Sequence, residues 1–326
     1  MRIIAAVLIA AALVALSPTE LLAQDAPAAG GGKKKIVFLA GRKSHAFGDH
    51  EHYAGCMLLA KRLNESGLVQ AEVVKDGWPK DESVLDGAAA VVMFSDGGGG
   101  HFAINKSKQL NALHDKGVGI GAIHYAVEVP KGKPGENWLK WMGGYFETNW
   151  SINPHWRANF TEIGKHPVGN GVKPFSTQDE WYYNMRFREN MQGVTPVLSA
   201  VPPDKTREGP MGPHSGNPEV RKGVGKNQKE HLLWVSENEN GSRGFGTTGA
   251  HFHWNWAQDD YRKAVLNACV WIAKVDVPEN GVESKRPTID ELLENQDDPV
   301  PPNFEKEAKA KEIEAMNQPQ AAQASK

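Results

Sequence analysis

The sequence contains little cysteine. Cys56 and Cys269 are the two cysteines in a chain of 326 residues, which is too few for a disulfide framework. They fall in the first and last helices that we predict for the folded region. Export of the chain would permit a bridge between them, but we expect two buried free thiols.

The sequence also has no excess of charge of either sign. Lysine and arginine number 37 and aspartate and glutamate 39, which gives a net charge of −2, and the two signs are well mixed along the chain. This balance argues against a nucleic-acid-binding face, and the short basic run Lys33–Lys35 is typical of a solvated segment. We therefore expect a small-molecule partner and no nucleic acid, while the sequence leaves the oligomeric state open.

Long hydrophobic runs are missing outside the N-terminus. Residues 1–23 combine Arg2, the apolar run Ile3–Leu16 and a plausible cleavage site at Leu21-Leu-Ala23, the pattern of a secretory signal peptide. This pattern predicts an exported chain, periplasmic or extracellular, with no integral membrane segment after cleavage. Residues 24–34 are predicted to form a linker.

Several common motifs are absent as well. The chain has no HExxH or CxxC metal motif and no GxxxxGK[ST] phosphate loop. The four glycines Gly97–Gly100 lack the downstream glycine of such a loop, since Asn105 precedes Lys106-Ser107. The glycines of Gly117–Gly121 enter a predicted strand, whereas those of a dinucleotide fingerprint open a helix after one. Neither stretch supports nucleotide binding.

The segment 35–282 alternates strand and helix patterns and predicts one α/β domain. Apolar strands are expected at Lys35–Ala40, Ala71–Val74, Ala88–Phe94 and Val118–Ile123, separated by helical segments. This order is typical of a doubly wound, mainly parallel sheet of the flavodoxin-like type, with three layers α/β/α. The charged tail 283–326 has little to bury and is predicted to be disordered, with a frayed helix over Glu305–Met316 as its one candidate element.

Polar residues follow the ends of several predicted strands. His45, Asp96 and His124 come after the first, third and fourth strands, and His251 precedes the last helix. Because the carboxyl ends of parallel strands share one edge, we expect these four side chains to converge there. Small residues before His124 favour a sharp turn like a nucleophile elbow, here carrying histidine. Of His251 and His253, two positions apart, we expect His251 to face the site.

Three interpretations of this cluster stay open. His45, His124 and His251 would suit Zn²⁺, although no sequence spacing supports a metal and no cofactor is certain. Metal-free acid–base catalysis by histidine is the second interpretation. Hydrogen bonding to a polyol substrate is the third.

Aromatic residues gather beside amides and carboxylates in three places, a pattern that suits a sugar ring as well as an ordinary core. The predicted substrate-binding residues are Arg42, Trp181, Tyr183, Asn184, His253 and Trp254.

The combination of segments resembles the ThuA (trehalose utilisation) family, a branch of the class I glutamine amidotransferase-like fold, and within it a secreted, planctomycete-type subgroup. The resemblance covers roughly residues 35–277. It is carried by Ile36–His45, Ser95–Gly97, Gly119–His124, Lys165–Pro167, Asp179–Asn184, Gly244–His251 and Leu266–Trp271.

The resemblance implies carbohydrate metabolism, on glycosides oxidised to a ketone, with His45, Asp96, His124, Glu180 and His251 as the matching polar positions. His124 stands where the amidotransferases carry their nucleophilic cysteine, so glutaminase chemistry is not expected.

We therefore predict an enzyme that abstracts a proton beside a ketone in a keto-glycoside or disaccharide and so allows isomerisation, elimination or hydrolysis. His124 is the first candidate base and His45 the second. A second histidine, Asn184 or a bound metal would stabilise the enolate oxygen. The alternative is a non-catalytic carbohydrate-binding domain.

The segment Val201–Lys229 is rich in proline and glycine and predicts a long connection without a helix or strand of its own. We expect this segment to border the site, with Arg207 and His214 as candidate contacts.

Overall fold

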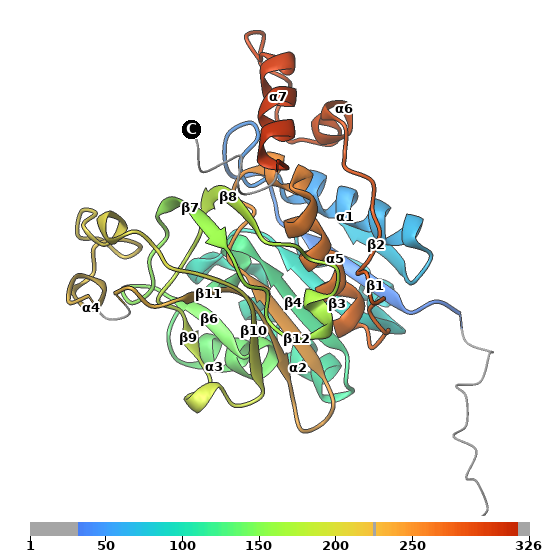
Figure 1. The fold of residues 1–326 in the computed structure, drawn as a ribbon. Coiled ribbons are helices and arrows are strands. Elements are labelled where there is room, and N and C mark those ends of the chain that lie inside the picture. Colours follow the sequence, from blue (N-terminus) through green and yellow to red (C-terminus); the bar gives the residue numbers. More distant parts are fainter. Residues whose placement is uncertain (1–31, 224–225, 319–326) are drawn as a thin grey trace, which may run out of the picture. The chain divides into compact units, whose positions relative to one another are not determined.

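A seven-stranded sheet forms the centre of the protein in the computed structural model, which describes residues 32–223 and 226–318 (Figure 1). The strand order is β10-β11-β12-β4-β3-β1-β2, and all neighbours are parallel except the pairs that β11 makes. The strands are β1 (Lys35–Ala40), β2 (Gln70–Val74), β3 (Ala88–Phe94), β4 (Gly119–Ile123), β10 (Val194–Ala200), β11 (Glu230–Glu237) and β12 (Arg243–Thr247). The predicted doubly wound, mainly parallel α/β fold is confirmed.

Two smaller sheets are attached to this centre. One contains β5 (Glu128–Val129), β6 (Gly144–Glu147) and β9 (Arg186–Phe187), and the other pairs β7 (His155–Phe160) with β8 (Phe175–Glu180). The α-helices are α1 (His52–Ser66), α2 (Ser107–Asp115), α3 (Lys133–Met142), α4 (Pro218–Arg221), α5 (Asp259–Ile272), α6 (Ile289–Leu293) and α7 (Lys306–Met316). The 3-10 helices are η1 (Glu82–Leu85), η2 (Gly98–Gly100), η3 (Phe102–Lys106), η4 (His124–Val127), η5 (Pro167–Gly169), η6 (Glu189–Met191), η7 (Asp204–Arg207) and η8 (His253–Ala257).

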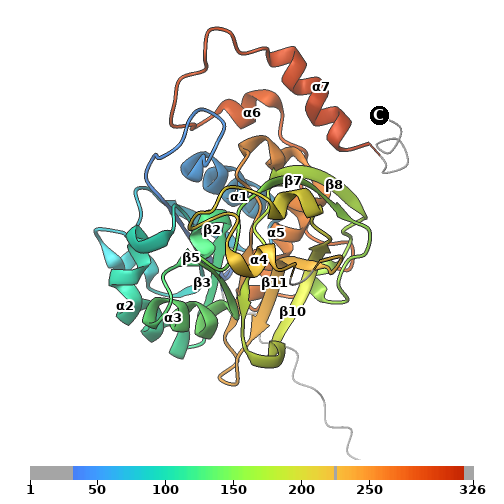
Figure 2. The ribbon, with the colours of Figure 1, turned by 90° about the vertical axis from the view of Figure 1, so that its left-hand side faces the viewer.

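Helices cover both faces of the central sheet (Figures 1 and 2). Alternate residues of β1 separate two cores, because Ile36 and Phe38 pack with α1 and α5 whereas Val37 and Leu39 pack with α2 and α3. This alternation buries both sides of each central strand, as expected for a parallel sheet. Cys56 in α1 and Cys269 in α5 lie in the same core, both buried and free.

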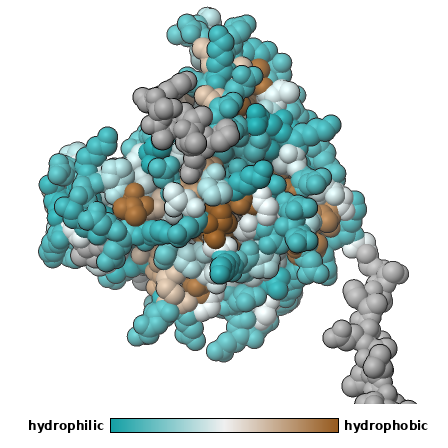
Figure 3. Space-filling view, in the orientation of Figure 1, coloured by the Kyte–Doolittle hydropathy of each residue, from teal (hydrophilic) through white to brown (hydrophobic). Residues whose placement is uncertain are grey.

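The signal-peptide prediction for residues 1–23 and most of the predicted linker, residues 24–31, lie outside the described residues. Among residues 32–223 and 226–318, no helix has both the length and the apolar character needed to cross a bilayer. The surface in Figure 3 is largely hydrophilic, with apolar residues in small separate patches.

The prediction of a disordered tail is wrong for residues 283–318. Helix α6 forms there without having been expected, α7 forms where a frayed helix was expected, and Leu292 and Ile313 are buried. Thr288 and Glu291 form a capping box at the start of α6, and Phe304 stacks on Trp254 with ring centroids 5.5 Å apart. A few well-spaced apolar side chains stabilise this segment. The average composition of the tail does not reveal them, because most of its residues are polar.

The expectation for Val201–Lys229 also needs correction. Its described part contains two short helices, η7 and α4, and the side chain of Asn217 caps α4 by accepting a hydrogen bond from the Val220 N–H. Val220 is fully buried. The connection therefore packs onto the protein despite its proline and glycine content.

Glycines in β4 permit the close packing of α5 against the sheet. A Cβ atom on Gly119 would lie 2.2 Å from the carbonyl oxygen of Ile272 at the end of α5. Backbone atoms at such a contact cannot rotate away as a side-chain end can. Gly119, one of the small residues that precede the turn at His124, is thus required for α5 to pack against β4.

We predict that Gly119→Ala destabilises the fold by about 3 kcal/mol, because overpacking against backbone forces α5 away from the sheet. Gly100→Ala is the matched control, since a Cβ there meets nothing within 4 Å, and it should change stability by less than about 0.5 kcal/mol. Urea unfolding of both variants measures the difference. Equal stability of the two would show that α5 adjusts freely.

His101 generates a prediction about acid stability. Its Nδ1 accepts a hydrogen bond from the backbone of Ala103, and burial lowers its pKa to about 3 from 6.5. Between these values the unfolded chain binds a proton that the folded protein does not, so stability falls as pH drops. The loss through this residue alone is about 2 kcal/mol at pH 5.

His101→Asn keeps a side-chain acceptor for Ala103 but cannot titrate. The variant should therefore lose about 2 kcal/mol less stability than the native protein between pH 7.5 and pH 5, whatever its stability at neutral pH. Denaturant unfolding at both pH values measures this difference. Identical losses in the two proteins would contradict the assignment.

Candidate active site

The fourth parallel strand places a histidine at the edge of the sheet. β4 ends at Ile123, and His124 has φ +55°, as expected for a sharp turn after a strand. The His124 ring is fully buried, and its Nδ1 lies 2.8 Å from the carbonyl oxygen of Thr248. A carbonyl only accepts, so Nδ1 carries a proton, and Nε2 is the nitrogen directed at the rest of the cluster.

His50 lies at the centre of the cluster, and sequence reasoning missed it. Its Nδ1–H donates to Asp96 Oδ1 at 3.0 Å, while its Nε2 is 3.1 Å from His124 Nε2 and 2.9 Å from His251 Nδ1. The backbone turns sharply at His50, where φ is +49°, and α1 begins two residues later at His52.

His251 is held by the backbone as well as by its side chain. The Asp179 carboxylate accepts from the N–H groups of Ala250 and His251 at 2.7 and 3.0 Å, and the His251 carbonyl accepts from the His50 N–H at 2.9 Å. The Asp179 bonds fix the turn after Gly249, in which Ala250 has φ +87°. His253, two residues later, is buried away from the cluster, as expected from the spacing.

Glu180 completes the group at the end of β8. Its Oε2 is 3.4 Å from His124 Nε2 and 3.2 Å from His251 Nδ1, and its Oε1 accepts from the Asn153 amide at 2.8 Å. Burial would raise the pKa of Glu180, but its contacts with His124, His155 and His251 hold that pKa below the usual value. Glu180 is therefore a carboxylate at neutral pH.

The electrostatics of the cluster follow from burial and this pairing. Burial and the neighbouring imidazoles lower the pKa of His50 to about 2, against the effect of Asp96. Burial would raise the pKa of Asp96, but its bond with His50 and the nearby His52 hold it at about 2. Burial lowers the pKa of His251, yet Glu180 raises it overall.

An accessible edge surrounds this buried group. The His45 ring stacks on His50 with centroids 3.6 Å apart, its Nδ1 is 3.7 Å from Asp96, and 40% of its side chain is exposed. His155 lies 3.6 Å from Glu180 with 48% of its side chain exposed. These two imidazoles are the ones that a bound molecule would meet first.

The Val201–Lys229 connection borders this edge, as expected. His214 Nε2 bonds Glu128 Oε1 at 2.8 Å, which raises the pKa of His214. The His214 ring also contacts Tyr125, the residue after His124. Arg207, the other candidate contact, instead lies over the ring of Tyr183.

The structure brings together all five residues predicted to be catalytic: His45, Asp96, His124, Glu180 and His251. His45, Asp96 and His124 meet because each follows a parallel strand, and the carboxyl ends of those strands share one edge. Glu180 arrives from the separate sheet of β7 and β8.

The residues predicted to bind substrate are mostly elsewhere. Trp181 and Tyr183 are fully buried; Trp181 donates to the Thr177 carbonyl, and Tyr183 bonds Thr206. His253 is buried, and Trp254 packs against the tail. These aromatic residues therefore pack in the core or against the tail and do not form a sugar-binding face.

The remaining two predicted contacts differ from each other. Asn184 has φ +56° and donates to the Trp150 carbonyl at 2.7 Å, so its role is to hold a turn. The side chain of Arg42 is exposed on the same loop as His45. Arg42 alone of the six stays a candidate for substrate contact.

The residues that could hold a metal are not the predicted set. The ligand atoms of His50, His124, Glu180 and His251 lie within 4.8 Å of one another, whereas His45 groups with His50 and Asp96. His50 therefore replaces His45 beside His124 and His251. The available signal was the dense run of titratable residues Asp49-His50-Glu51-His52.

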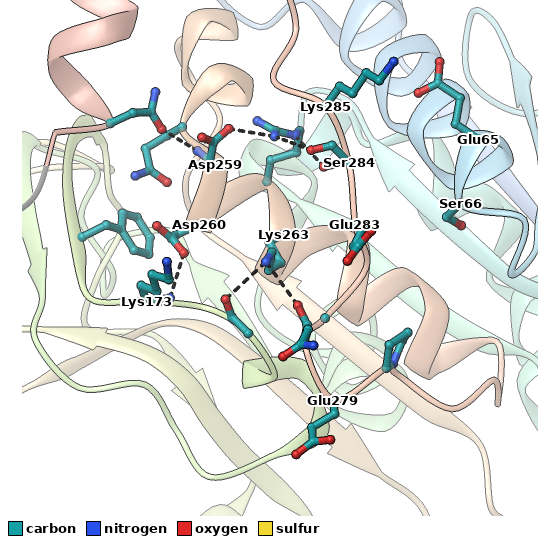
Figure 4. Close-up of a pocket in the computed structure, with 18 of the residues that line it drawn as sticks. Glu65, Ser66, Lys173, Asp259, Asp260, Lys263, Glu279, Glu283, Ser284 and Lys285 are labelled. Atoms are coloured by element: carbon teal, nitrogen blue, oxygen red, sulfur yellow. Dashed lines mark hydrogen bonds and ion pairs between the residues drawn. The ribbon is translucent and has the colours of Figure 1, made fainter.

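A hollow of about 1470 Å³ lies elsewhere, beside the start of α5 (Figure 4). Two of its charged groups already have partners: Lys263 donates to the carbonyls of Gly171 and Asn280, and Asp260 accepts from the Lys173 N–H. Size alone makes it prominent, and we place the chemistry at the histidine cluster.

Comparison with known proteins agrees with this fold. The sequence model of the family described as ThuA: trehalose utilisation matches residues 37–272. A comparison with curated proteins gave no match.

Among solved structures, a ThuA-like protein from Bacteroides uniformis is similar, with a TM-score of 0.53 and 16% identity over 77% of this chain and 95% of that one. A ThuA-like protein from Parabacteroides merdae has a TM-score of 0.46 and 16% identity, over 78% and 98% of the two chains. A glutamine amidotransferase from Thermotoga maritima has a TM-score of 0.38 and 10% identity over 75% and 90%. At these identities the similarity concerns the fold alone, and the Bacteroides uniformis structure is the one of the three similar enough to support it.

Asp179 generates a prediction about the site. We predict that Asp179→Asn destabilises the protein by about 3 kcal/mol, because an amide NH₂ would face backbone N–H groups that now donate to a buried carboxylate. Asp86→Asn, at an exposed position, is the control and should change stability by less than about 0.5 kcal/mol. Chemical unfolding compares the two, and a stable Asp179→Asn variant would contradict this role.

Proposed function

The chain belongs to the ThuA family, and from that relation, which supports a carbohydrate-related role, we propose that it is an exported enzyme acting on a keto-glycoside or keto-disaccharide. The reaction is proton transfer at the carbon beside the ketone. Export rests on the signal-peptide pattern of residues 1–23.

The observation that carries the proposal is an accessible imidazole backed by a carboxylate at the edge of a buried polar cluster. His45 stacks on His50, its Nδ1 is 3.7 Å from Asp96, and its side chain is partly exposed. Ser44 Oγ lies 2.8 Å from Nδ1 and can accept its proton, an arrangement that leaves Nε2 as the basic nitrogen. His45 can therefore accept a proton from a bound molecule.

The base assignment changes from the one made on sequence. His124 was the first candidate, but its ring is fully buried, its Nδ1–H donates to Thr248, and its Nε2 faces His50 and Tyr182. A substrate carbon has no access to either nitrogen without displacing these groups. His45, the second candidate, takes the role.

The chemistry follows from the acidity of a C–H bond next to a ketone. His45 removes this proton, the C–H electron pair forms a carbon–carbon double bond, and the carbonyl pair moves onto oxygen as an enolate. Collapse of the enolate expels the glycosidic oxygen one carbon further on, and the imidazolium returns the proton to it. Return of the proton to carbon instead gives an isomer, and addition of water after elimination completes a hydrolysis.

The alternative, a non-catalytic carbohydrate-binding domain, loses its main support. Binding domains present aromatic faces to sugars, but Trp181 and Tyr183 are in the core and Trp254 packs against Phe304. What remains at the edge is a set of titratable groups, which suits catalysis better than stacking.

We predict that His45→Asn lowers turnover of oxidised disaccharides by about a hundredfold or more, while affinity changes by less than about tenfold. His231→Gln, which removes an imidazole that bonds Ser199 and packs on Phe187, should leave both values near those of the native protein. Steady-state kinetics with a panel of keto-disaccharides, together with melting curves for both variants, provides the measurement.

A binding domain would show no turnover in any of these proteins and would keep its affinity when His45 is replaced. Equal turnover in the native protein and the His45→Asn variant would contradict the base assignment while leaving the substrate class intact.

A further inference from the structure

We propose that His50, His124, His251 and Glu180 bind one divalent transition-metal ion through Nε2, Nε2, Nδ1 and Oε2, respectively. The site adjoins the proposed base His45 and deepens the proposed function. Metal binding itself rests on the four side chains and does not depend on which sugar the protein accepts.

The first argument is the number of protons in the cluster. His50 donates its Nδ1 proton to Asp96, and His124 donates its Nδ1 proton to the Thr248 carbonyl. When both rings are neutral, two Nε2 lone pairs face each other at 3.1 Å, with the Glu180 carboxylate 3.4 Å from one of them.

Few hydrogens are available to these acceptors. The Tyr182 hydroxyl is 3.1 Å from His124 Nε2 and can donate there, and a proton on His251 Nδ1 would serve both His50 and Glu180. The contact between the lone pairs of His50 and His124 remains unfavourable. A cation at this point satisfies all four acceptors at once.

The second argument is the spacing of the ligand atoms. Neighbouring pairs are separated by 2.9, 3.1, 3.2 and 3.4 Å. Bonds of about 2.0–2.1 Å from nitrogen or oxygen to Zn²⁺ in a tetrahedral site place ligand atoms roughly 3.3 Å apart. Four of the six pairs are thus already near this separation, and all four atoms lie within 4.8 Å of one another, close enough to share one ion.

The third argument is the support behind each ligand. Asp96 accepts from His50, the Thr248 carbonyl accepts from His124, and Asn153 donates to the outer oxygen of Glu180. Metal sites hold ligating imidazoles in this way, with the far N–H bonded to a carboxylate or backbone carbonyl. Asp49 lies 3.8 Å from the far nitrogen of His251, so each ligand has a polar neighbour behind it.

The ligand chemistry selects the class of metal. Three imidazoles and one carboxylate suit Zn²⁺ and other first-row transition ions, whereas Mg²⁺ and Ca²⁺ prefer oxygen ligands. The four side chains fill the positions of a tetrahedral ion, so the ion would stabilise the enolate oxygen formed by His45 only by expanding to five ligands, as catalytic Zn²⁺ sites can do.

The test uses the full chain without an affinity tag that contains histidine. After removal of metal with a chelator, we expect one equivalent of Co²⁺ or Zn²⁺ to bind per chain, measured by calorimetry and by the visible spectrum of Co²⁺. Mg²⁺ should bind at least about a hundredfold more weakly. His50→Gln and Glu180→Gln should each weaken Co²⁺ binding by about a hundredfold or more.

His45→Asn is the matched control, since it removes an imidazole at the same edge that is not a ligand, and its Co²⁺ affinity should stay within about threefold. Melting curves exclude unfolding as the cause of any loss in the ligand variants. The proposal is overturned if the native chain binds Co²⁺ and Zn²⁺ no better than Mg²⁺. It is also overturned if folded His50→Gln binds Co²⁺ like the native chain.

The two proposals fail separately. Co²⁺ binding that depends on His50 and Glu180, without turnover of any keto-sugar, would remove the proposed function and keep the metal site. Equal turnover of a keto-sugar with and without added metal, together with no specific Co²⁺ binding, would remove the metal site and keep the proposed function.

Discussion

The parallel pairing of β3, β4 and β12 is the constraint on which the rest of the structure depends. It brings the carboxyl ends of these strands to one edge, and the glycines of β4 allow α5 to pack closely beneath them. His124 directly follows the end of β4, and Asp96 lies two residues after the end of β3. The chemistry is concentrated at this edge because parallel strands deliver polar residues there while both faces of the sheet stay apolar.

Buried imidazoles are stable at this edge because other groups fix their protons and orientations. Asp96 and Thr248 determine which nitrogen of His50 and His124 carries hydrogen. Asp179 fixes the turn that presents His251. The result is an inner layer of rigid acceptors and an outer layer of accessible imidazoles. The proposed metal and the proposed base occupy these two layers, respectively.

Segments outside the central sheet complete the site. The β7–β8 pair contributes Glu180 and Asp179, and the Val201–Lys229 connection places His214 against Glu128. The tail reaches the loop before α1, where the Asp297 N–H donates to Glu51. These segments lie outside the parallel strands but supply side chains and contacts at the same edge.

The sequence by itself determined the sheet, its two cores and the convergence of His45, Asp96, His124 and His251, because apolar periodicity and the residues at strand ends are local features. The tertiary structure alone decided the place of His50, which depends on a left-handed turn and on contacts with residues far along the chain. It also decided that Trp181 and Tyr183 pack in the core and that the tail forms helices. Composition cannot distinguish an aromatic that meets a sugar from one that meets another ring, because that difference lies in what packs against it.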